Sequence, residues 1–342
     1  MSTGNRAASA LVVRNLCMGL RASQALYVAV KLGIADHLAA RPMRSAELAT
    51  ATNTHAVSLR RLLRALSALG VFAEQEPDCF ALTPVGELLR SGVPGSLRAV
   101  VLFLTGEVRW RCWANLVGCV RTGEPAAERV LGMPLFDYYA AHPEESAVHD
   151  DAMAAFTSVV SAAVLDAYDF SRFRCLVDVG GGTGQLLSDI LRAHPALQGV
   201  LLDLPHVVVD ARGLLSARGV ADRCRIEGGS FFDAVPKGGD AYLLKNVIHD
   251  WDDPHTTAIL VTCRKALPPE GTLLVLDRVL SERAEPGQGV DAFLLDLEML
   301  TMAGGRERTE SEFRELFDAA GFALVQRVPT TSPLSIIVGR PT

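Results

Sequence analysis

The sequence predicts a doubly wound α/β fold that follows a mainly helical, winged-helix-like N-terminal domain. Three observations lead to this prediction. Residues 175–193 have the pattern of a buried strand, a glycine turn and an amphipathic helix. Apolar runs then alternate with helical segments as far as the C-terminus. Before residue 100, two helical segments and a short hairpin follow one another.

The glycine turn is the clearest local motif. The apolar run at residues 175–179 leads directly into the sequence GGGTG at 180–184, and residues 185–193 place their leucines and isoleucine on one helical face. The next apolar run ends in Asp203, about 20 residues beyond the turn, where a ribose-binding carboxylate is expected. Many strand-to-helix connections use glycine only because the turn requires it, so the motif alone leaves both interpretations open.

The bulk composition excludes several classes of protein. The 342 residues are enough for two domains, and 49% apolar, 21% charged and 6% aromatic residues are typical of a globular protein. The net charge of −6 argues against a nucleic-acid partner. Seven cysteines without a C-x-x-C pair indicate reduced thiols of a cytoplasmic protein, not disulfides or a zinc site. We expect neither a signal peptide in residues 1–14 nor a membrane span.

The N-terminal segment has the element order of a winged helix. Helices are predicted over residues 7–40, 46–50 and 56–69, the last ending before Gly70, and a hairpin over 71–73 and 80–82. Three arginines on the 56–69 helix could face a DNA major groove: Arg60, Arg61 and Arg64. The alternative is a solvated basic face on a helix used for dimer packing, and the acidic net charge favours it.

Residues 96–170 are predicted to form several helices with a high aromatic content. A break is expected at His142-Pro143 and a further helix at residues 150–165. Trp110, Met153 and Phe156 are candidates for the wall of a ligand pocket, although such residues at helical spacing more often belong to a core.

The C-terminal half supplies the strands of the predicted sheet. They are expected at residues 175–179, 199–203, 224–227, 240–245 and 272–277, with a final pair near 322–328 and 335–339. Ligands of doubly wound sheets bind at the carboxyl ends of the strands. Several polar or small residues fall at such ends and therefore predict one shared site: Gly180, Asp203, Gly229, Ser230, Lys245 and Asp277.

The segment LLKNVIHDWDD at residues 243–253 carries the sharpest chemical signal. A buried strand delivers Lys245, and His249 follows one short turn later, beside the expected cleft. Histidine can take up a proton near neutral pH, and a nearby carboxylate can orient the ring and stabilise its cation. The candidate carboxylates are Asp277, at the end of the next strand, and Glu307 in a glycine-containing turn.

Each of these residues also has a purely structural interpretation. His249 could be a hydrogen-bonded structural histidine, Asp277 could pair with Arg278, and Glu307 could pair with a neighbouring arginine. Glu312 is predicted to form a capping box with Thr309. The aspartates Asp250, Asp252 and Asp253 are expected to begin the following helix. A metal site is disfavoured because no second histidine has suitable spacing from His249.

The ordered motifs resemble a known enzyme family. VDVGGGTG, LLDLPHVV, GGSFF, DAYLLKNVIHDWDD and GGRERTESEF are similar, in this order, to the caffeic-acid-type, metal-independent O-methyltransferases that use S-adenosylmethionine. The match is close to bacterial members that act in secondary metabolism, such as antibiotic biosynthesis. It extends over essentially the whole chain, because the N-terminal segment resembles the dimerisation domain of this family.

The resemblance implies a role for each matching residue. It places the amino-acid moiety of the cofactor along Gly180, Gly181 and Gly182, the ribose at Asp203 beside Leu204, and the adenine near Gly229, Ser230 and Phe231. Lys245 would also lie beside the cofactor. His249 matches the general base, and Asp277 and Glu307 match its flanking carboxylates. Two departures lower the precision of the match: Ser230 replaces the usual Asp of the adenine motif, and Asp277 is one methylene shorter than the usual Glu.

The resemblance also implies an architecture and partners. Residues 1–105 would form a dimerisation domain of a homodimer, and 106–342 a catalytic domain with a helical cap (106–170) and a Rossmann-like core (171–342). An aromatic acceptor would be methylated on a hydroxyl to leave S-adenosylhomocysteine, without a metal. Candidate acceptor-binding residues are Trp110, Met153, Phe156, Asn246, Asp250, Met299 and Met302.

Three rival functions remain at this point. The first is a C-methyltransferase or a non-methylating enzyme on the same fold. The second is an NAD-dependent dehydrogenase, although the GGGTG turn lacks the spacing of G-x-G-x-x-G. The third is a winged-helix regulator whose α/β domain senses a ligand.

Overall fold

The computed structural model describes residues 3–342 and divides into two compact units. One comprises Met1–Trp110 with Asp151–Ala155, and the other comprises Arg111–Asp150 with Phe156–Thr342. Met1 and Ser2 belong to the predicted N-terminal domain but lie outside the described residues. These units are defined by packing, so the predicted functional boundary near residue 105 stays a prediction.

The first unit is helical with one small sheet. Its strands pair in the antiparallel order β1-β3-β2, and its core includes Leu63, Leu66 and Phe80. The elements are α1 (Thr3–Lys31), α2 (Ile34–Leu38), β1 (Met43–Arg44), α3 (Ser45–Ala51), α4 (Ala56–Ala68), β2 (Phe72–Glu76), β3 (Cys79–Leu82), α5 (Pro84–Glu87), α6 (Arg98–Thr105) and the start of α7 (Glu107–Trp113). The predicted hairpin is present, and β1 extends it.

The helical character predicted for residues 7–40 is confirmed, but it is divided between two helices, α1 and α2. Gly33 adopts a left-handed backbone, with φ of 65°, and separates α1 from α2. Two of the three arginines considered for DNA contact form ion pairs nearby, because Arg60 pairs with Asp78 at 3.2 Å and Arg64 with Glu74 at 3.5 Å. These contacts favour the solvated basic face over a DNA-reading helix.

The second unit is built on a seven-stranded sheet in the order β11-β12-β8-β7-β4-β5-β6. The strands β8, β7, β4, β5 and β6 are parallel, whereas β12 and β11 run antiparallel at one edge. The strands are β4 (Cys175–Val179), β5 (Gln198–Asp203), β6 (Cys224–Gly228), β7 (Ala241–Lys245), β8 (Thr272–Asp277), β11 (Phe322–Pro329) and β12 (Ser335–Pro341). All seven predicted strands are present, with ends shifted by two residues at most.

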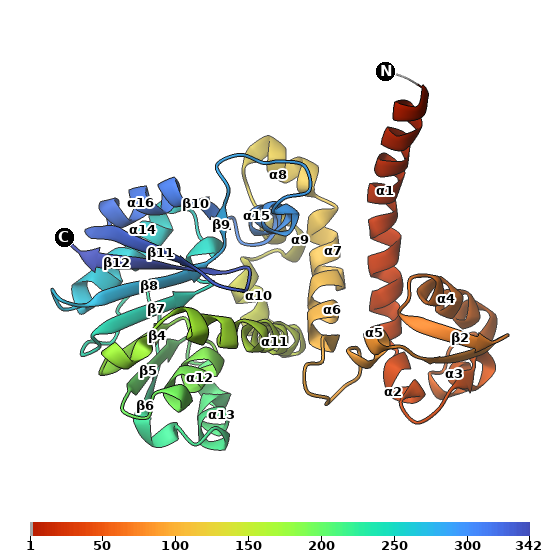
Figure 1. Cartoon of the computed structure of the whole chain (residues 1–342), viewed down its shortest axis with the longest axis horizontal. Coiled ribbons are helices and arrows are strands. Elements are labelled where there is room, and N and C mark those ends of the chain that lie inside the picture. Colours follow the sequence, from red (N-terminus) through yellow and green to blue (C-terminus); the bar gives the residue numbers. More distant parts are fainter. Residues whose placement is uncertain (1–2) are drawn as a thin grey trace. The chain divides into compact units, whose positions relative to one another are not determined.

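Helices cover both faces of this sheet (Figure 1). One face packs on α14 and α16 through residues such as Leu260 and Phe317, and the other packs on α12 and α13 through Leu187 and Leu215. This arrangement is the doubly wound α/β class that the alternating pattern predicts. The helices of this unit, α11 in part, are α8 (Leu116–Thr122), α9 (Ala126–Leu131), α10 (Leu135–Ala141), α11 (Pro143–Ala167), α12 (Gln185–Ala193), α13 (Ala211–Ala217), α14 (Asp253–Ala266), α15 (Val290–Met302) and α16 (Glu310–Ala319).

Two further features concern the surface and helix α11. Within residues 3–342, α11 is the one helix whose length and apolar composition would suffice to cross a membrane, a criterion that core helices of soluble proteins also meet. The break expected at His142-Pro143 lies between α10 and α11.

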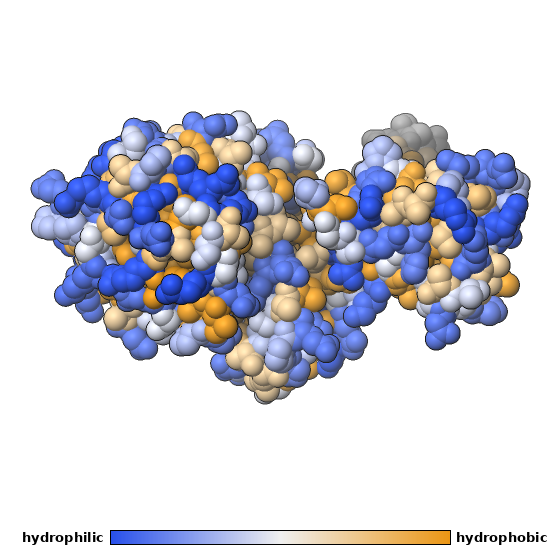
Figure 2. Space-filling view, turned by 90° about the horizontal axis from the view of Figure 1, so that it is seen from below, coloured by the Kyte–Doolittle hydropathy of each residue, from blue (hydrophilic) through white to orange (hydrophobic). Residues whose placement is uncertain are grey.

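Figure 2 shows one face of the molecule, on which hydrophilic and hydrophobic residues are interspersed.

Candidate active site

The glycine turn lies between β4 and α12 and brings backbone N–H groups to the carboxyl end of β5. Gly182 has φ of 61°, and no other group would lie within 4 Å of a Cβ at this position. A Cβ on Gly181 would instead lie 2.5 Å from the Asp178 carboxyl group. The backbone N–H of Gly182 donates to Oδ2 of Asp203 at 2.7 Å, and that of Leu204 donates to Oδ1 at 2.7 Å. Burial raises the pKa of Asp203, although both hydrogen bonds oppose the rise.

The loop after β6 is tied to the same strand end. The backbone N–H of Gly229 donates to the carbonyl oxygen of Asp203 at 2.9 Å, and Ser230 Oγ accepts from the N–H of Phe232. The Phe231 ring meets the Trp251 ring edge-on, with centroids 6.2 Å apart. The structure therefore gathers Gly180, Gly181, Gly182, Asp203, Leu204 and the 229–231 loop around the carboxyl ends of β4, β5 and β6.

The end of β7 brings further polar groups beside the carboxyl end of β4. Burial lowers the pKa of Lys245, and the charge of Asp178 on the adjacent strand β4 opposes the decrease. Asn246 follows with φ of 52°, an unusual conformation for a residue other than glycine. Its side-chain Oδ1 is buried and accepts no hydrogen bond. A buried acceptor without a donor is costly, so Asn246 is suited to meet a ligand donor.

His249 lies in a short 3₁₀ turn, Ile248–Asp250, directly after this segment and is 8% exposed. Its Nδ1 lies 2.8 Å from Oε1 of Glu307 and 3.7 Å from Oδ1 of Asp277. Its Nε2 lies 3.7 Å from Oδ1 of Asp250. The two carboxylates that the sequence offered as alternatives thus both flank the same ring nitrogen, and Glu307 makes the hydrogen bond.

Three carboxylates determine the protonation of this histidine. Burial by itself would lower the pKa of His249, but the charges of Asp250, Asp277 and Glu307 and the hydrogen bond to Glu307 raise it to about 10. Burial raises the pKa of Asp277 to about 7, against the influence of the His249 cation. These carboxylates therefore favour the imidazolium form of His249.

The turn that carries Glu307 is held by contacts that the sequence pattern did not indicate. β10 (Arg308–Thr309) pairs in parallel with β9 (Val279–Leu280), and Asp296 of α15 accepts the backbone N–H of Glu307 at 2.8 Å. A Cβ on Gly305 would collide with the carbonyl oxygen of His249. Two-residue strands and a single aspartate on a helix leave no recognisable sequence signal.

Several structural alternatives weighed for this region can be resolved. Thr309 and Glu312 form the predicted capping box of α16. Asp252 is the N-cap of α14 and Asp253 its first residue, whereas Asp250 faces His249, so its assignment to the helix start was wrong. Asp277 is completely buried beside His249.

The candidate acceptor-binding residues are divided between the two units. Met299 and Met302 are buried on α15, and Phe156, Asn246 and Asp250 belong to the same unit, whereas Trp110 and Met153 belong to the first unit. Their predicted role in one pocket stays a prediction. Within residues 3–342, no group of three or more His, Cys, Asp or Glu side chains is arranged to hold a metal ion.

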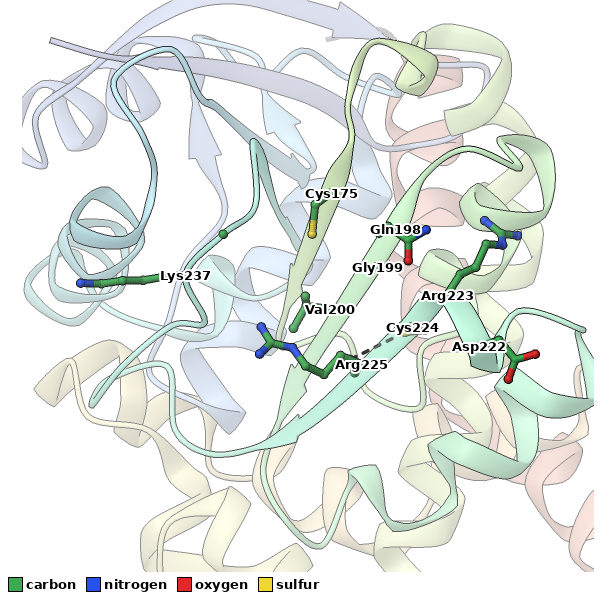
Figure 3. Close-up of a pocket in the computed structure, with 10 residues that line it drawn as sticks. Cys175, Gln198, Gly199, Val200, Asp222, Arg223, Cys224, Arg225 and Lys237 are labelled. Atoms are coloured by element: carbon green, nitrogen blue, oxygen red, sulfur yellow. Dashed lines mark hydrogen bonds between the residues drawn. The ribbon is translucent and has the colours of Figure 1, made fainter.

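Two cavities accompany the second unit. One, of about 480 Å³, lies at the amino ends of β4, β5 and β6 and is lined by residues including Cys175, Arg225 and Lys237 (Figure 3). It is therefore at the opposite end of these strands from the glycine turn. The other, of about 540 Å³, is lined by residues including Asp296, Gly305 and Glu307 and adjoins the turn that supports His249.

The fold and the site together define a cofactor-binding α/β enzyme with a histidine–carboxylate centre. A family model described as the O-methyltransferase domain matches residues 113–323, and one described as the O-methyltransferase dimerisation domain matches residues 15–92. The chain therefore belongs to the O-methyltransferase family, as the ordered motifs predict, and is an S-adenosylmethionine-dependent enzyme.

Three known proteins illustrate its similarity. Phenazine O-methyltransferase PhzM of Lysobacter antibioticus is 45% identical over 100% of both chains. The crystal structure of the O-methyltransferase NcsB1 from neocarzinostatin biosynthesis, in complex with S-adenosylmethionine and 2-hydroxy-5-methyl naphthoic acid, has a TM-score of 0.83. It is 34% identical, and the match covers 94% of this chain and 96% of that one. Aclacinomycin 10-hydroxylase RdmB of Streptomyces purpurascens is 39% identical over 88% of this chain and 81% of its own.

The described residues fit S-adenosylmethionine. The carboxylate of Asp203, at the end of β5, suits a pair of ribose hydroxyls, and the open left-handed backbone at Gly182 allows a ligand to approach closely. The first backbone N–H groups of the nine-residue helix α12 have no partner within the helix, and its N-cap, Gly184, supplies no side-chain cap. This N-terminus is therefore suited to bind the carboxylate of the cofactor's amino-acid portion. These features match the ribose and amino-acid portions of this cofactor.

Proposed function

We propose that the protein methylates a hydroxyl, phenolic in the first instance, of an aromatic small molecule, with His249 as the general base. The observation that carries this proposal is the bond between His249 Nδ1 and Glu307 at 2.8 Å. Because Nδ1–H donates to Glu307, the lone pair resides on Nε2, which is then the nitrogen that takes the acceptor proton.

The chain mainly orients two substrates and moves one proton. S-adenosylmethionine supplies the methyl group on a sulfonium, whose leaving group is a neutral thioether, so the transfer requires no Lewis acid. The glycine turn, Asp203 and Lys245 hold the cofactor in this proposal, with Gly229, Ser230 and Phe231 beside the adenine. His249 removes the hydroxyl proton as the oxygen attacks, while Glu307 and Asp277 stabilise the imidazolium.

The high basicity of His249 has a consequence for the order of events. With its pKa near 10, the imidazole is protonated at neutral pH when the cleft holds no cation. A sulfonium in the same cleft is a like charge and disfavours the imidazolium, so cofactor binding lowers this pKa. In this proposal the base becomes available once the cofactor is bound.

The acceptor and the assembly extend the proposal. PhzM is named for phenazine, and NcsB1 was crystallised with a naphthoic acid. Both compounds are aromatic, which supports an aromatic acceptor here. We assign Trp110, Met153, Phe156, Asn246, Asp250, Met299 and Met302 to its pocket. The dimerisation-domain match supports a homodimer. Location in the cytoplasm stays a prediction.

One specific observation favours a second candidate. The hydroxylase RdmB shows by its name that a protein 39% identical to this one is assigned a different reaction. A non-methylating enzyme on the same fold is therefore the alternative to O-methylation, ahead of a dehydrogenase or a DNA-binding regulator.

The proposal is tested by calorimetry with S-adenosylhomocysteine, followed by turnover with a panel of phenols. Asp203→Ala removes a charged acceptor worth roughly 1.5–3 kcal/mol per hydrogen bond, so affinity should fall by at least about tenfold. Asp210→Ala, a change at an exposed aspartate beyond the same strand, should leave affinity unchanged.

Products from the panel should gain the mass of one methyl group at a hydroxyl oxygen. Tight cofactor binding together with a product that gains oxygen would establish the hydroxylase alternative. A wild-type enzyme that binds no S-adenosylhomocysteine would refute the cofactor assignment, and Ser230 would be the first residue to examine.

A further inference from the structure

We propose that Arg308 is a positioning residue that fixes His249 against Glu307. The inference rests on the proposed role of His249 and adds a residue that touches neither substrate nor cofactor. Arg308 is 1% exposed and directly follows Glu307 in the chain. Its guanidinium contacts the backbone on both sides of His249, so one side chain connects the two segments that form the catalytic pair.

The contacts of Arg308 use all three guanidinium nitrogens. Nη1 donates to the carbonyl oxygen of Ile248 at 2.9 Å, and Nη2 donates to that of Trp251 at 2.8 Å. Nε and Nη2 donate to Oδ1 of Asp253 at 3.0 and 2.8 Å. Nη2 also lies 3.2 Å from Oγ1 of Thr256 in α14. The residue before His249 and the second residue after it are thus held by one planar group.

The geometry explains why an arginine is required here. The carbonyl oxygens of Ile248 and Trp251 also accept from the Thr256 hydroxyl, at 3.1 and 3.3 Å, and the arginine adds to these bonds five donors in a fixed fork. The buried cation is balanced by Asp253, which is about half exposed, and by these carbonyl dipoles. A lysine would keep the charge but could not bridge two carbonyls and a carboxylate at once.

Backbone contacts complete the connection between the two segments. The N–H of Arg306 donates to the carbonyl oxygen of His249 at 2.9 Å, and Gly305 packs directly against the same carbonyl. Arg308 thus holds the carbonyl oxygens of Ile248 and Trp251, and the 305–306 backbone holds that of His249. A loss of the guanidinium bridge therefore allows the imidazole to turn away from Glu307, and displacements of about 1 Å can cost about 10²-fold in rate.

The charged groups around His249 predict the signature of such a displacement. Asp250 from its own turn, Asp277 from β8 and Glu307 before β10 all raise its pKa. Two cations lie near these carboxylates: Lys245 of β7, which interacts with Asp250 and Asp277, and Arg308, which opposes the rise in the pKa of Asp277. A ring that loses Glu307 therefore titrates at lower pH, closer to the ordinary histidine value of about 6.5.

The test compares Arg308→Lys with Arg306→Lys in the full chain. Arg306 is a matched control because it also pairs with Asp253, at 3.4 Å, but its side chain is 42% exposed. Arg308→Lys should lower kcat about 10- to 100-fold at saturating acceptor while the affinity for S-adenosylhomocysteine changes less than twofold. Arg306→Lys should leave both within about twofold.

Nuclear magnetic resonance of enzyme with ¹⁵N-labelled histidine provides a readout that does not depend on turnover. The His249 signal, assigned by its loss in His249→Gln, should shift and titrate at lower pH in Arg308→Lys but not in Arg306→Lys. If Arg308→Lys does not fold, Asp253→Ala removes the carboxylate from the same guanidinium and should move the signal in the same direction.

Two results would overturn the inference. One is an Arg308→Lys enzyme with wild-type kcat and an unshifted His249 signal. The other is an Arg308→Lys preparation with fewer active molecules, in which the folded molecules show the wild-type His249 signal. That result would indicate that Arg308 only stabilises the fold. If His249→Ala kept its turnover while Arg308→Lys still moved the signal, the base assignment would fail and the positioning role would stand.

Discussion

At the scale of single residues, the site is organised by one histidine among three acidic groups. The imidazole of His249 contacts Glu307, Asp277 and Asp250 within 4 Å and is 8% exposed. A folded-state pKa of about 10 exceeds the unfolded value of about 6.5, so these contacts favour the imidazolium. The same contacts make the neutral ring a strong base.

This arrangement predicts the pH dependence of methyl transfer. Because the proposed reaction needs neutral His249, the single-turnover rate should rise with pH through a limb that lies above about 6.5. Glu307→Gln removes one stabilising charge and should move that limb to lower pH while it lowers the maximal rate. Asp277, with its pKa near 7, is coupled to this titration, so the limb belongs to the group as a whole.

The measurement is the single-turnover rate from about pH 6 to about pH 10, a range that includes both the ordinary histidine pKa and the raised pKa of His249. The control is Glu310→Gln, since Glu310 lies in the first turn of α16 and contacts Arg314 and Arg327 instead of His249. A limb at the same pH in wild type and Glu307→Gln would show that Glu307 does not set the basicity of the catalytic group.

Residue-level prediction from the sequence identified the histidine and carboxylates that lie together but not the residues that support them. His249, Asp277 and Glu307 could be found because each follows a strand end or a glycine turn, where side chains of a doubly wound sheet converge. The sequence could not decide which carboxylate makes the hydrogen bond. Arg308 and Asp296 were missed because a buried arginine and a helical aspartate have no distinguishing pattern.

At the scale of elements, the loop before β10 packs so closely against the 249–251 backbone that it has no space for a side chain at Gly305. Gly305 has an ordinary backbone conformation, yet a Cβ there would overlap the carbonyl oxygen of His249 and lie 2.5 Å from the backbone nitrogen of Trp251. Both neighbours are backbone atoms, which cannot rotate away as a side chain can. The requirement for glycine is therefore steric.

We expect Gly305→Ala to destabilise the protein and to slow catalysis. Overpacking of this kind costs about 1–3 kcal/mol, and any relaxation moves the backbone of His249. Gly213→Ala is the matched control, because no group lies within 4 Å of a Cβ at that position in α13, where alanine should stabilise the helix by about 0.5–1 kcal/mol. Urea unfolding gives both changes, and equal stability of Gly305→Ala and wild type would contradict the steric argument.

The elements differ in how well their sequence predicts them. α12 spans the predicted residues 185–193, and β4 and β8 begin and end where predicted, because abrupt apolar runs and glycines mark their ends. The break at Gly33 was missed since apolar periodicity continues across it. β9 and β10 consist of two residues each and depend on tertiary contacts.

At the scale of the whole molecule, the sequence predicts the family more securely than the acceptor. Long-range order of motifs defines the doubly wound sheet and its cofactor, and both family models match. α1 carries strongly exposed apolar side chains, including Leu16 at 76% and Val13 at 61%, as expected of a chain that contains a dimerisation domain. The proposed acceptor-binding residues lie on helices far apart in sequence, and no sequence pattern fixes which acceptor they would bind.

The central claim is that His249 takes the acceptor proton in a reaction that uses S-adenosylmethionine. The most direct test is the single-turnover methylation rate of His249→Ala, with His255→Ala as a control at an exposed histidine of the next helix. We predict a loss of about 10²–10⁴-fold for His249→Ala with unchanged affinity for S-adenosylhomocysteine, and a wild-type rate for His255→Ala. A His249→Ala enzyme that methylates its acceptor at the wild-type rate would contradict the claim.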